Sequence, residues 1–149
     1  MNRLVKFWLL TQQEKWFLCE ASILLLVSSL SVRVISFKRI YGFLGRRYDA
    51  FKTYAGEASS CASEIKLIDL SILRAANGLP WNTLCLSRSL AAFIMLRRRG
   101  IPAVLLAGVK ALDDSSLSAH AWVNAGEKAS EKNPQNCEFS VVIKIGQAI

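Results

Sequence analysis

The hydrophobic pattern of this chain changes once, from helical spacing to short apolar runs, and this change limits the fold more than any other feature. Before residue 100, apolar residues recur every three or four positions, which is typical of helices with one buried face. After residue 102, short runs of aliphatic and β-branched residues are separated by turn residues, as in strands. Helices first and a small antiparallel sheet last predict an α+β domain.

Three helices are expected before residue 80. The first opens at the capping box Thr11-Gln12-Gln13-Glu14 and runs to about Leu30. The second covers about Phe37 to Tyr48. The third carries apolar residues from Ile65 to Ala76, and Asn77-Gly78 is expected to stop it in a left-handed conformation.

The fourth helix has the clearest ends. It is expected from about Leu84 to Arg99, with Asn82 or Thr83 as its cap and Gly100 as its stop. Three strands should follow at about 103–109, 118–124 and 139–145, with a turn at Gly126 between the second and the third.

Size and charge narrow the class of protein. A chain of 149 residues is long enough for one compact domain, so we expect a single domain over 1–149. The formal charge of +8 is spread along the chain and favours an acidic peptide or an anionic surface. Because the sequence has no zinc finger, no glycine-rich phosphate loop and no basic stripe with aromatic residues, we expect no nucleic-acid partner.

The four cysteines indicate a reducing compartment. Cys19, Cys61, Cys85 and Cys137 have long, irregular spacings that suggest neither a disulfide framework nor a zinc site. We therefore expect no metal and no cofactor. The N-terminus has no clear cleavage site for a secretory signal, and a cytoplasmic location fits best.

An apolar stretch from Trp16 to Ile35 raises the question of a membrane. Glu20 and Arg33 interrupt it, and its uninterrupted core is shorter than the ~20 residues that a bilayer requires. We expect a helix that is buried or lies on a partner or a membrane, and membrane association is possible but not favoured.

Cys85 and His120 are the residues that could carry chemistry. Cys85 stands at the start of the fourth expected helix, where the helix dipole and free N–H groups favour a thiolate and could bind an oxyanion. His120, the only histidine, lies on the second expected strand and could accept the thiol proton. On spacing alone, a buried structural cysteine and a structural histidine remain the commoner roles.

A third polar group would be needed to orient the His120 ring. If the chain turns at Ala125-Gly126, the residue opposite His120 on the next strand lies close to Glu131, with Asn133 two positions further on the same face. Either side chain could orient the imidazole.

Four segments carry a family pattern: Cys85-Leu86-Ser87-Arg88-Ser89-Leu90, Leu96-Arg97-Arg98-Arg99-Gly100-Ile101-Pro102-Ala103, Gly108-Val109 and His120-Ala121-Trp122-Val123. Together they resemble the lasso-peptide leader peptidases, the B2-type maturation proteins of the transglutaminase-like, papain-like superfamily. The resemblance covers the whole chain and is strongest from Trp81 to Val123. It implies an N-terminal helical part over 1–55 and a papain-like cysteine protease core over 56–149.

The resemblance implies a cysteine endopeptidase that removes the leader from a ribosomally made lasso precursor peptide, with Cys85 as nucleophile and His120 as base. It also implies a separate B1-type recognition protein that presents the leader, since the chain begins almost directly with the B2-like helices. A separate lasso cyclase would close the ring. The apolar N-terminal helices would then dock the recognition protein or the cyclase.

One departure from the family pattern affects the third residue. The family places an aspartate about a dozen residues after the histidine, whereas this chain has no aspartate beyond Asp114. Glu131 takes that place if the turn is one residue shorter, and Asn133 is the alternative. The departure also motivates a second hypothesis, a non-catalytic peptide-binding scaffold with a degenerate protease fold. A third hypothesis is a transferase, in which an amine instead of water attacks the thioester formed on the cysteine. Such an enzyme would use the same catalytic residues.

Overall fold

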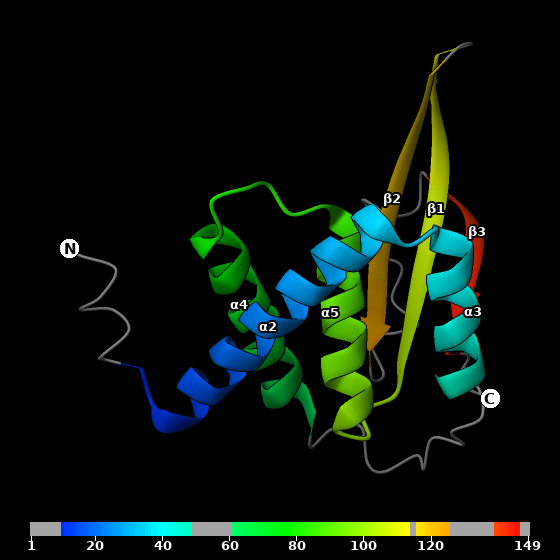
Figure 1. The fold of residues 1–149 in the computed structure, drawn as a ribbon. Coiled ribbons are helices and arrows are strands. Elements are labelled where there is room, and N and C mark those ends of the chain that lie inside the picture. Colours follow the sequence, from blue (N-terminus) through cyan, green and yellow to red (C-terminus); the bar gives the residue numbers. More distant parts are fainter. Residues whose placement is uncertain (1–9, 49–60, 114–115, 126–138, 147–149) are drawn as a thin grey trace.

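The computed structural model describes residues 10–48, 61–113, 116–125 and 139–146, which form helices followed by a sheet (Figure 1). This order confirms the predicted α+β class. The helices are α2 (Gln12–Val34), α3 (Phe37–Tyr48), α4 (Ala62–Gly78) and α5 (Cys85–Arg98), and the strands are β1 (Ala103–Asp113), β2 (Ser116–Ala125) and β3 (Ser140–Ile145).

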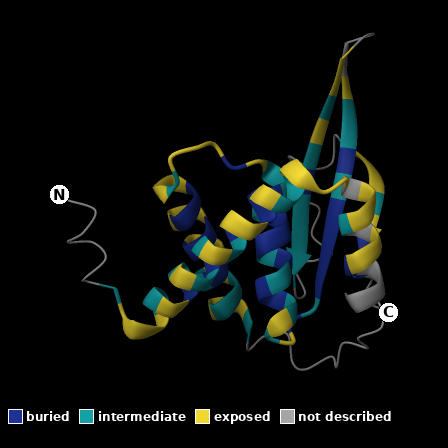
Figure 2. Cartoon of the chain, in the orientation of Figure 1, coloured by how far each residue is buried: buried dark blue, intermediate teal, exposed yellow. Residues whose placement is uncertain are grey.

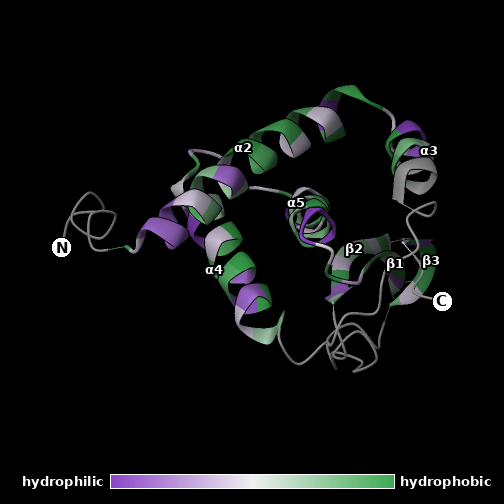
Figure 3. Cartoon of the chain, turned by 90° about the horizontal axis from the view of Figure 1, so that it is seen from below, coloured by the Kyte–Doolittle hydropathy of each residue, from purple (hydrophilic) through white to green (hydrophobic). Residues whose placement is uncertain are grey.

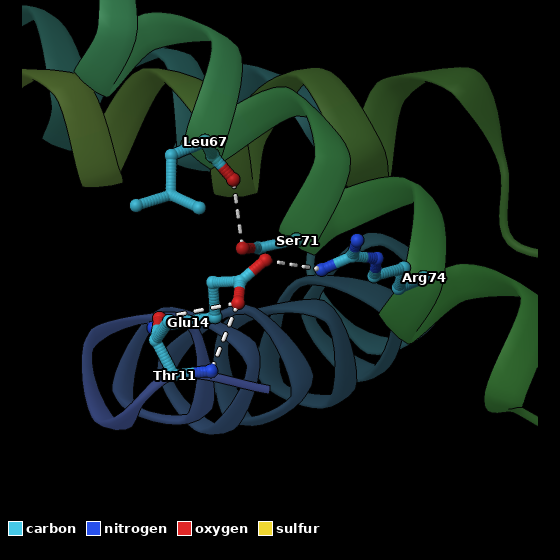
Figure 4. Close-up of polar contacts among 5 residues, drawn as sticks. All are labelled: Thr11, Glu14, Leu67, Ser71 and Arg74. Atoms are coloured by element: carbon cyan, nitrogen blue, oxygen red, sulfur yellow. Dashed lines mark hydrogen bonds and ion pairs between the residues drawn. The ribbon is translucent and has the colours of Figure 1, made fainter. Parts of the chain in front are cut away.

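The start of α2 is stabilised as its sequence predicts. The Thr11 hydroxyl accepts a hydrogen bond from the Glu14 backbone N–H, and the Glu14 carboxylate accepts one from the Thr11 backbone N–H at 3.0 Å. The same carboxylate pairs with Arg74 of α4 at 3.2 Å (Figure 4). The capping box therefore also joins the first turn of α2 to α4.

Helix α5 lies at the centre of the molecule, between the sheet on one side and α2 and α4 on the other (Figures 1 and 3). Its residues Phe93 and Met95 are fully buried, and they pack in one hydrophobic core with Leu25 of α2 and Ile68 of α4. Figure 2 shows the same gradient, with α5 mostly buried and the outer sides of α2 and α4 exposed. A central helix surrounded in this way is held rigidly.

The ends of α4 and α5 differ in part from the predictions. Gly100 has a φ of 73° and ends α5 as expected. At the end of α4 the predicted left-handed stop is wrong, because Gly78 is not among the described glycines with positive φ and the helix continues through it to an extended Leu79. The predicted cap of α5 is also wrong, since the N-cap is Leu84, which has no side chain that can cap.

The sheet is antiparallel with the strand order β2-β1-β3. Its central strand β1 pairs Leu105 with Val123 of β2 and with Ile145 of β3. These three side chains belong to, or pack against, the core that α5 shares with the other helices. Among the described strands, β3 pairs with β1 and β2 lies at an edge, and the turn expected at Gly126 lies outside the described residues.

Candidate active site

Cys85 is the first residue of α5, as the sequence predicts. The side chain is half-buried and its thiol is free. The first N–H of α5 with an intrahelical acceptor is that of Arg88, which donates to the Leu84 carbonyl at 3.2 Å. Within the described chain, the N–H groups of Cys85, Leu86 and Ser87 have no hydrogen-bond partner.

The missing cap has a chemical consequence. Most helices begin with a side chain that occupies one of these N–H groups, whereas Leu84 leaves them open. Three open N–H groups and the positive end of the helix dipole lie at the helix start that carries Cys85, where they can stabilise negative charge on a thiolate or on an oxyanion.

The loop before Cys85 is fixed by the helix that follows it. The Arg88 side chain donates from Nε to the Thr83 hydroxyl at 2.6 Å, and Thr83 is buried. Thr83 was expected as a cap for the backbone, but its oxygen instead binds this guanidinium. The contact holds the segment that leads into Cys85 in place.

Helix α5 is tied to β2 by Ser89, which lies one turn after Cys85. The Ser89 hydroxyl donates a buried hydrogen bond to the Ala121 carbonyl at 2.8 Å. Residues four apart lie on the same face of a helix, so Cys85 also faces β2. Because α5 and β2 run side by side in the same direction (Figure 1), Cys85 lies at about the level of Ala119 and His120.

His120 lies on β2, as predicted, and its ring belongs to an aromatic cluster. The ring centroid is 5.9 Å from that of Trp122, with the planes at 17°, and 5.4 Å from that of Phe139. Ala121 and Val123 face the helices, so the alternation of side chains along a strand turns His120 and Trp122 to the opposite face of the sheet. No hydrogen bond joins His120 to Cys85, although both residues are described.

A glycine makes room for this cluster. Gly108 of β1 is the cross-strand partner of His120. A Cβ atom at this position would lie 2.9 Å from the Ser140 carbonyl oxygen and 3.1 Å from the Trp122 ring. Such distances are shorter than van der Waals contact, so only glycine lets the Trp122 ring lie across β1 beside His120.

Glu131 and Asn133, the two candidates for the third residue, lie outside the described residues. On the β1 side of β2, the cross-strand partner of His120 is Gly108. Ser89 and Arg88, which tie α5 to β2 and to the preceding loop, were not predicted as residues of the site. Their spacing from Cys85 was a usable signal, since residues three and four positions later share its side of the helix.

Among the described residues, no group of His, Cys, Asp and Glu could hold a metal ion.

These features define a class of protein before any comparison. A helix that begins at a cysteine, with open N–H groups and an antiparallel sheet along its side, is consistent with a papain-like core.

Comparison with known families agrees with this class. Residues 30–144 match the transglutaminase-like superfamily. Because the match covers most of the chain, the protein belongs to this superfamily, which includes cysteine proteases. Neither the curated proteins nor the solved structures give a significant match.

Proposed function

We propose that the protein is a cysteine endopeptidase that cleaves the leader from a lasso precursor peptide, and that it acts in the cytoplasm with a separate leader-recognition protein. The observation that carries the proposal is the position of Cys85 at the uncapped start of α5, in a chain of the transglutaminase-like superfamily. The choice of a lasso precursor as the substrate rests in addition on the resemblance of residues 81–123 to the leader peptidases.

The proposed reaction uses the groups around Cys85. The sulfur attacks the carbonyl carbon of the scissile bond, and the open N–H groups of α5 bind the oxyanion that forms. His120 takes the thiol proton and gives it to the amine of the core peptide, which leaves. The leader remains as a thioester on Cys85 until water, deprotonated by His120, hydrolyses it and regenerates the thiol.

His120 must leave its aromatic cluster for this reaction. Because the His120 side chain lies on the face of the sheet away from α5, this rearrangement has to bring the ring round β2, which is the edge strand among the described residues. Cys85 lies at that level of β2. We propose that the bound precursor favours the rotated ring, which pairs with the sulfur only when a scissile bond is present.

The test is cleavage of candidate precursor peptides in the presence of candidate recognition proteins, followed by mass spectrometry. The wild type should release leader and core, Cys85→Ala should release neither, and His120→Ala should lower kcat/KM by about 10² to 10⁴. Cys61→Ala is the matched control, because Cys61 is also a free, half-buried cysteine but lies at the start of α4. Cleavage by Cys85→Ala at the wild-type rate would refute the proposal.

The stacked His120 ring favours a second candidate, a peptide-binding scaffold that has kept the fold without the chemistry. A scaffold would bind the precursor with the same affinity in wild type and Cys85→Ala and would cleave it in neither. The products also separate hydrolysis from transfer. A free leader carboxylate indicates a peptidase, whereas a leader amide indicates an acyltransferase.

A further inference from the structure

Helix α2 presents an apolar surface that nothing in the described chain covers. Five large apolar residues of this helix have between 54% and 81% of their surface exposed. We call them the α2 stripe: Trp16, Ile23, Val27, Leu30 and Val34. Their spacings of seven, four, three and four residues place them on one side of the helix. Figure 3 shows α2 along the outside of the molecule, with its hydrophobic C-terminal half at the edge.

The charges around the α2 stripe are predominantly positive. Residues 10–48 contain two acidic side chains, Glu14 and Glu20, and six basic ones. Glu14 pairs with Arg74 of α4, and Glu20 pairs with Arg98 and Arg99 at the end of α5. Both carboxylates are thus occupied by arginines of the helices behind α2.

Three cations at the C-terminal end of the stripe have no such partner. Arg33 of α2 and Lys38 and Arg39 of α3 are exposed, and no described carboxylate lies within ion-pair distance of them. Phe43, one turn after Arg39, is 65% exposed. At the other end, Trp16 and Ile23 line a hollow of about 510 Å³ with the exposed Arg98 at its rim.

We propose that the α2 stripe binds the surface of an anionic phospholipid bilayer, with α2 lying flat in the interface. Aliphatic side chains on one face, a tryptophan at one end and unpaired cations beside them are the features of interfacial helices. The positive charge matches anionic headgroups. A second copy of the chain that used the same surface would need acidic residues to meet Arg33, Lys38 and Arg39, and the described part of α2 and α3 offers none that is unpaired.

The contacts of α2 explain why it lies on the bilayer. By length and composition this helix is able to cross a membrane. However, Phe17, Ala21 and Leu25 on its inner face are buried against the core, and Glu20 is held by two arginines. Spanning a bilayer would break all of these contacts, whereas lying on its surface keeps them.

The experiment is flotation of the purified full chain with vesicles of phosphatidylcholine, with and without phosphatidylglycerol. We expect binding to the anionic vesicles, weakened by salt and lost in Ile23→Ser/Leu30→Ser. Lys38→Gln/Arg39→Gln should weaken binding by roughly fivefold per charge. Leu70→Ser/Leu73→Ser is the matched control, since it removes two exposed leucines from α4 and should leave binding unchanged.

Three results would overturn the proposal. One is the absence of binding to anionic vesicles. Another is a stripe-dependent dimer, or a stripe-dependent complex with the leader-recognition protein, that forms without vesicle binding. The last is resistance of the bound protein to alkaline carbonate, which would mean that α2 spans the bilayer. The proposal does not depend on the peptidase activity, because none of these variants changes Cys85 or His120.

Discussion

At the scale of single residues, two small residues determine where the parts of the candidate site lie. Ser89 holds α5 against β2 next to His120, through one buried hydrogen bond. Gly108 allows the Trp122 ring to lie beside His120 on the other face of the sheet. Neither residue forms a hydrogen bond with the Cys85 sulfur in the structure, so both are positioning residues in the proposed peptidase.

Replacement of Ser89 tests its role in placing Cys85. Ser89→Ala leaves the Ala121 carbonyl without its partner and should lower the free energy of unfolding by about 1–3 kcal/mol. It should also lower kcat more than it changes KM, because α5 is no longer held at the level of His120. Ser71→Ala is the control, since Ser71 is buried but donates within its own helix to the Leu67 carbonyl. Equal losses of kcat in both variants would contradict the positioning role.

Gly108→Ala tests the packing of the aromatic cluster. The added methyl group has no space between the Ser140 carbonyl and the Trp122 ring, so the free energy of unfolding should fall by about 1–3 kcal/mol. Gly42→Ala in α3 is the control, because a Cβ there meets nothing within 4 Å and should raise stability by about 0.5–1 kcal/mol. Chemical denaturation measures both. An unchanged Gly108→Ala would mean that the cluster is not packed as described.

At the scale of elements, Arg99 joins three helices. It follows the last residue of α5, donates to the Met95 carbonyl, and pairs with Glu20 of α2 and Glu64 of α4. Its guanidinium also lies 4.2 Å from the centre of the Phe17 ring. A planar guanidinium can serve all of these partners at once, so this one residue fixes α2 and α4 relative to α5.

Arg99→Met should therefore cost more than the loss of an ordinary surface charge. We expect the free energy of unfolding to fall by about 2–3 kcal/mol, since Glu20 and Glu64 lose a shared and largely covered partner. Arg98→Met should cost under about 1 kcal/mol, because the Arg98 side chain is 61% exposed and makes one ion pair. Similar losses in the two variants would show that Arg99 does not join the helices.

The contact between α2 and α4 at Glu14 should make stability depend on pH. The Thr11 backbone N–H, and next the Arg74 side chain, hold the pKa of Glu14 below its ordinary value of 4.5. A carboxyl group with a lowered pKa stabilises the fold above its unfolded pKa, and this contribution is lost as the pH falls through the folded pKa. Glu14→Gln should thus be less stable than wild type at neutral pH and equal to it at about pH 2. A difference that persists in acid would contradict this origin.

At the scale of the whole molecule, some local features were predictable, whereas the order of the strands was not. The capping box at Thr11 and the stop at Gly100 are contacts within a few residues, and both are observed. The strand order depends on which distant segments bury the same face, so the sequence alone did not place β3 beside β1. The same pairing decides the face of His120, which the sequence could not reveal. Cys85 could be placed at a helix start because that depends on nearby residues alone.

The central claim is that Cys85 forms a thioester with the leader, and intact mass spectrometry of the protein during turnover of a precursor tests it most directly. We predict an adduct equal to the leader minus one water on the wild-type chain, which maps to Cys85 after digestion. The adduct should be absent from Cys85→Ala and should form slowly in His120→Ala. Two results would contradict the claim. One is release of free leader by Cys85→Ala. The other is an adduct that maps to Cys19 or Cys61 in a chain that releases the leader.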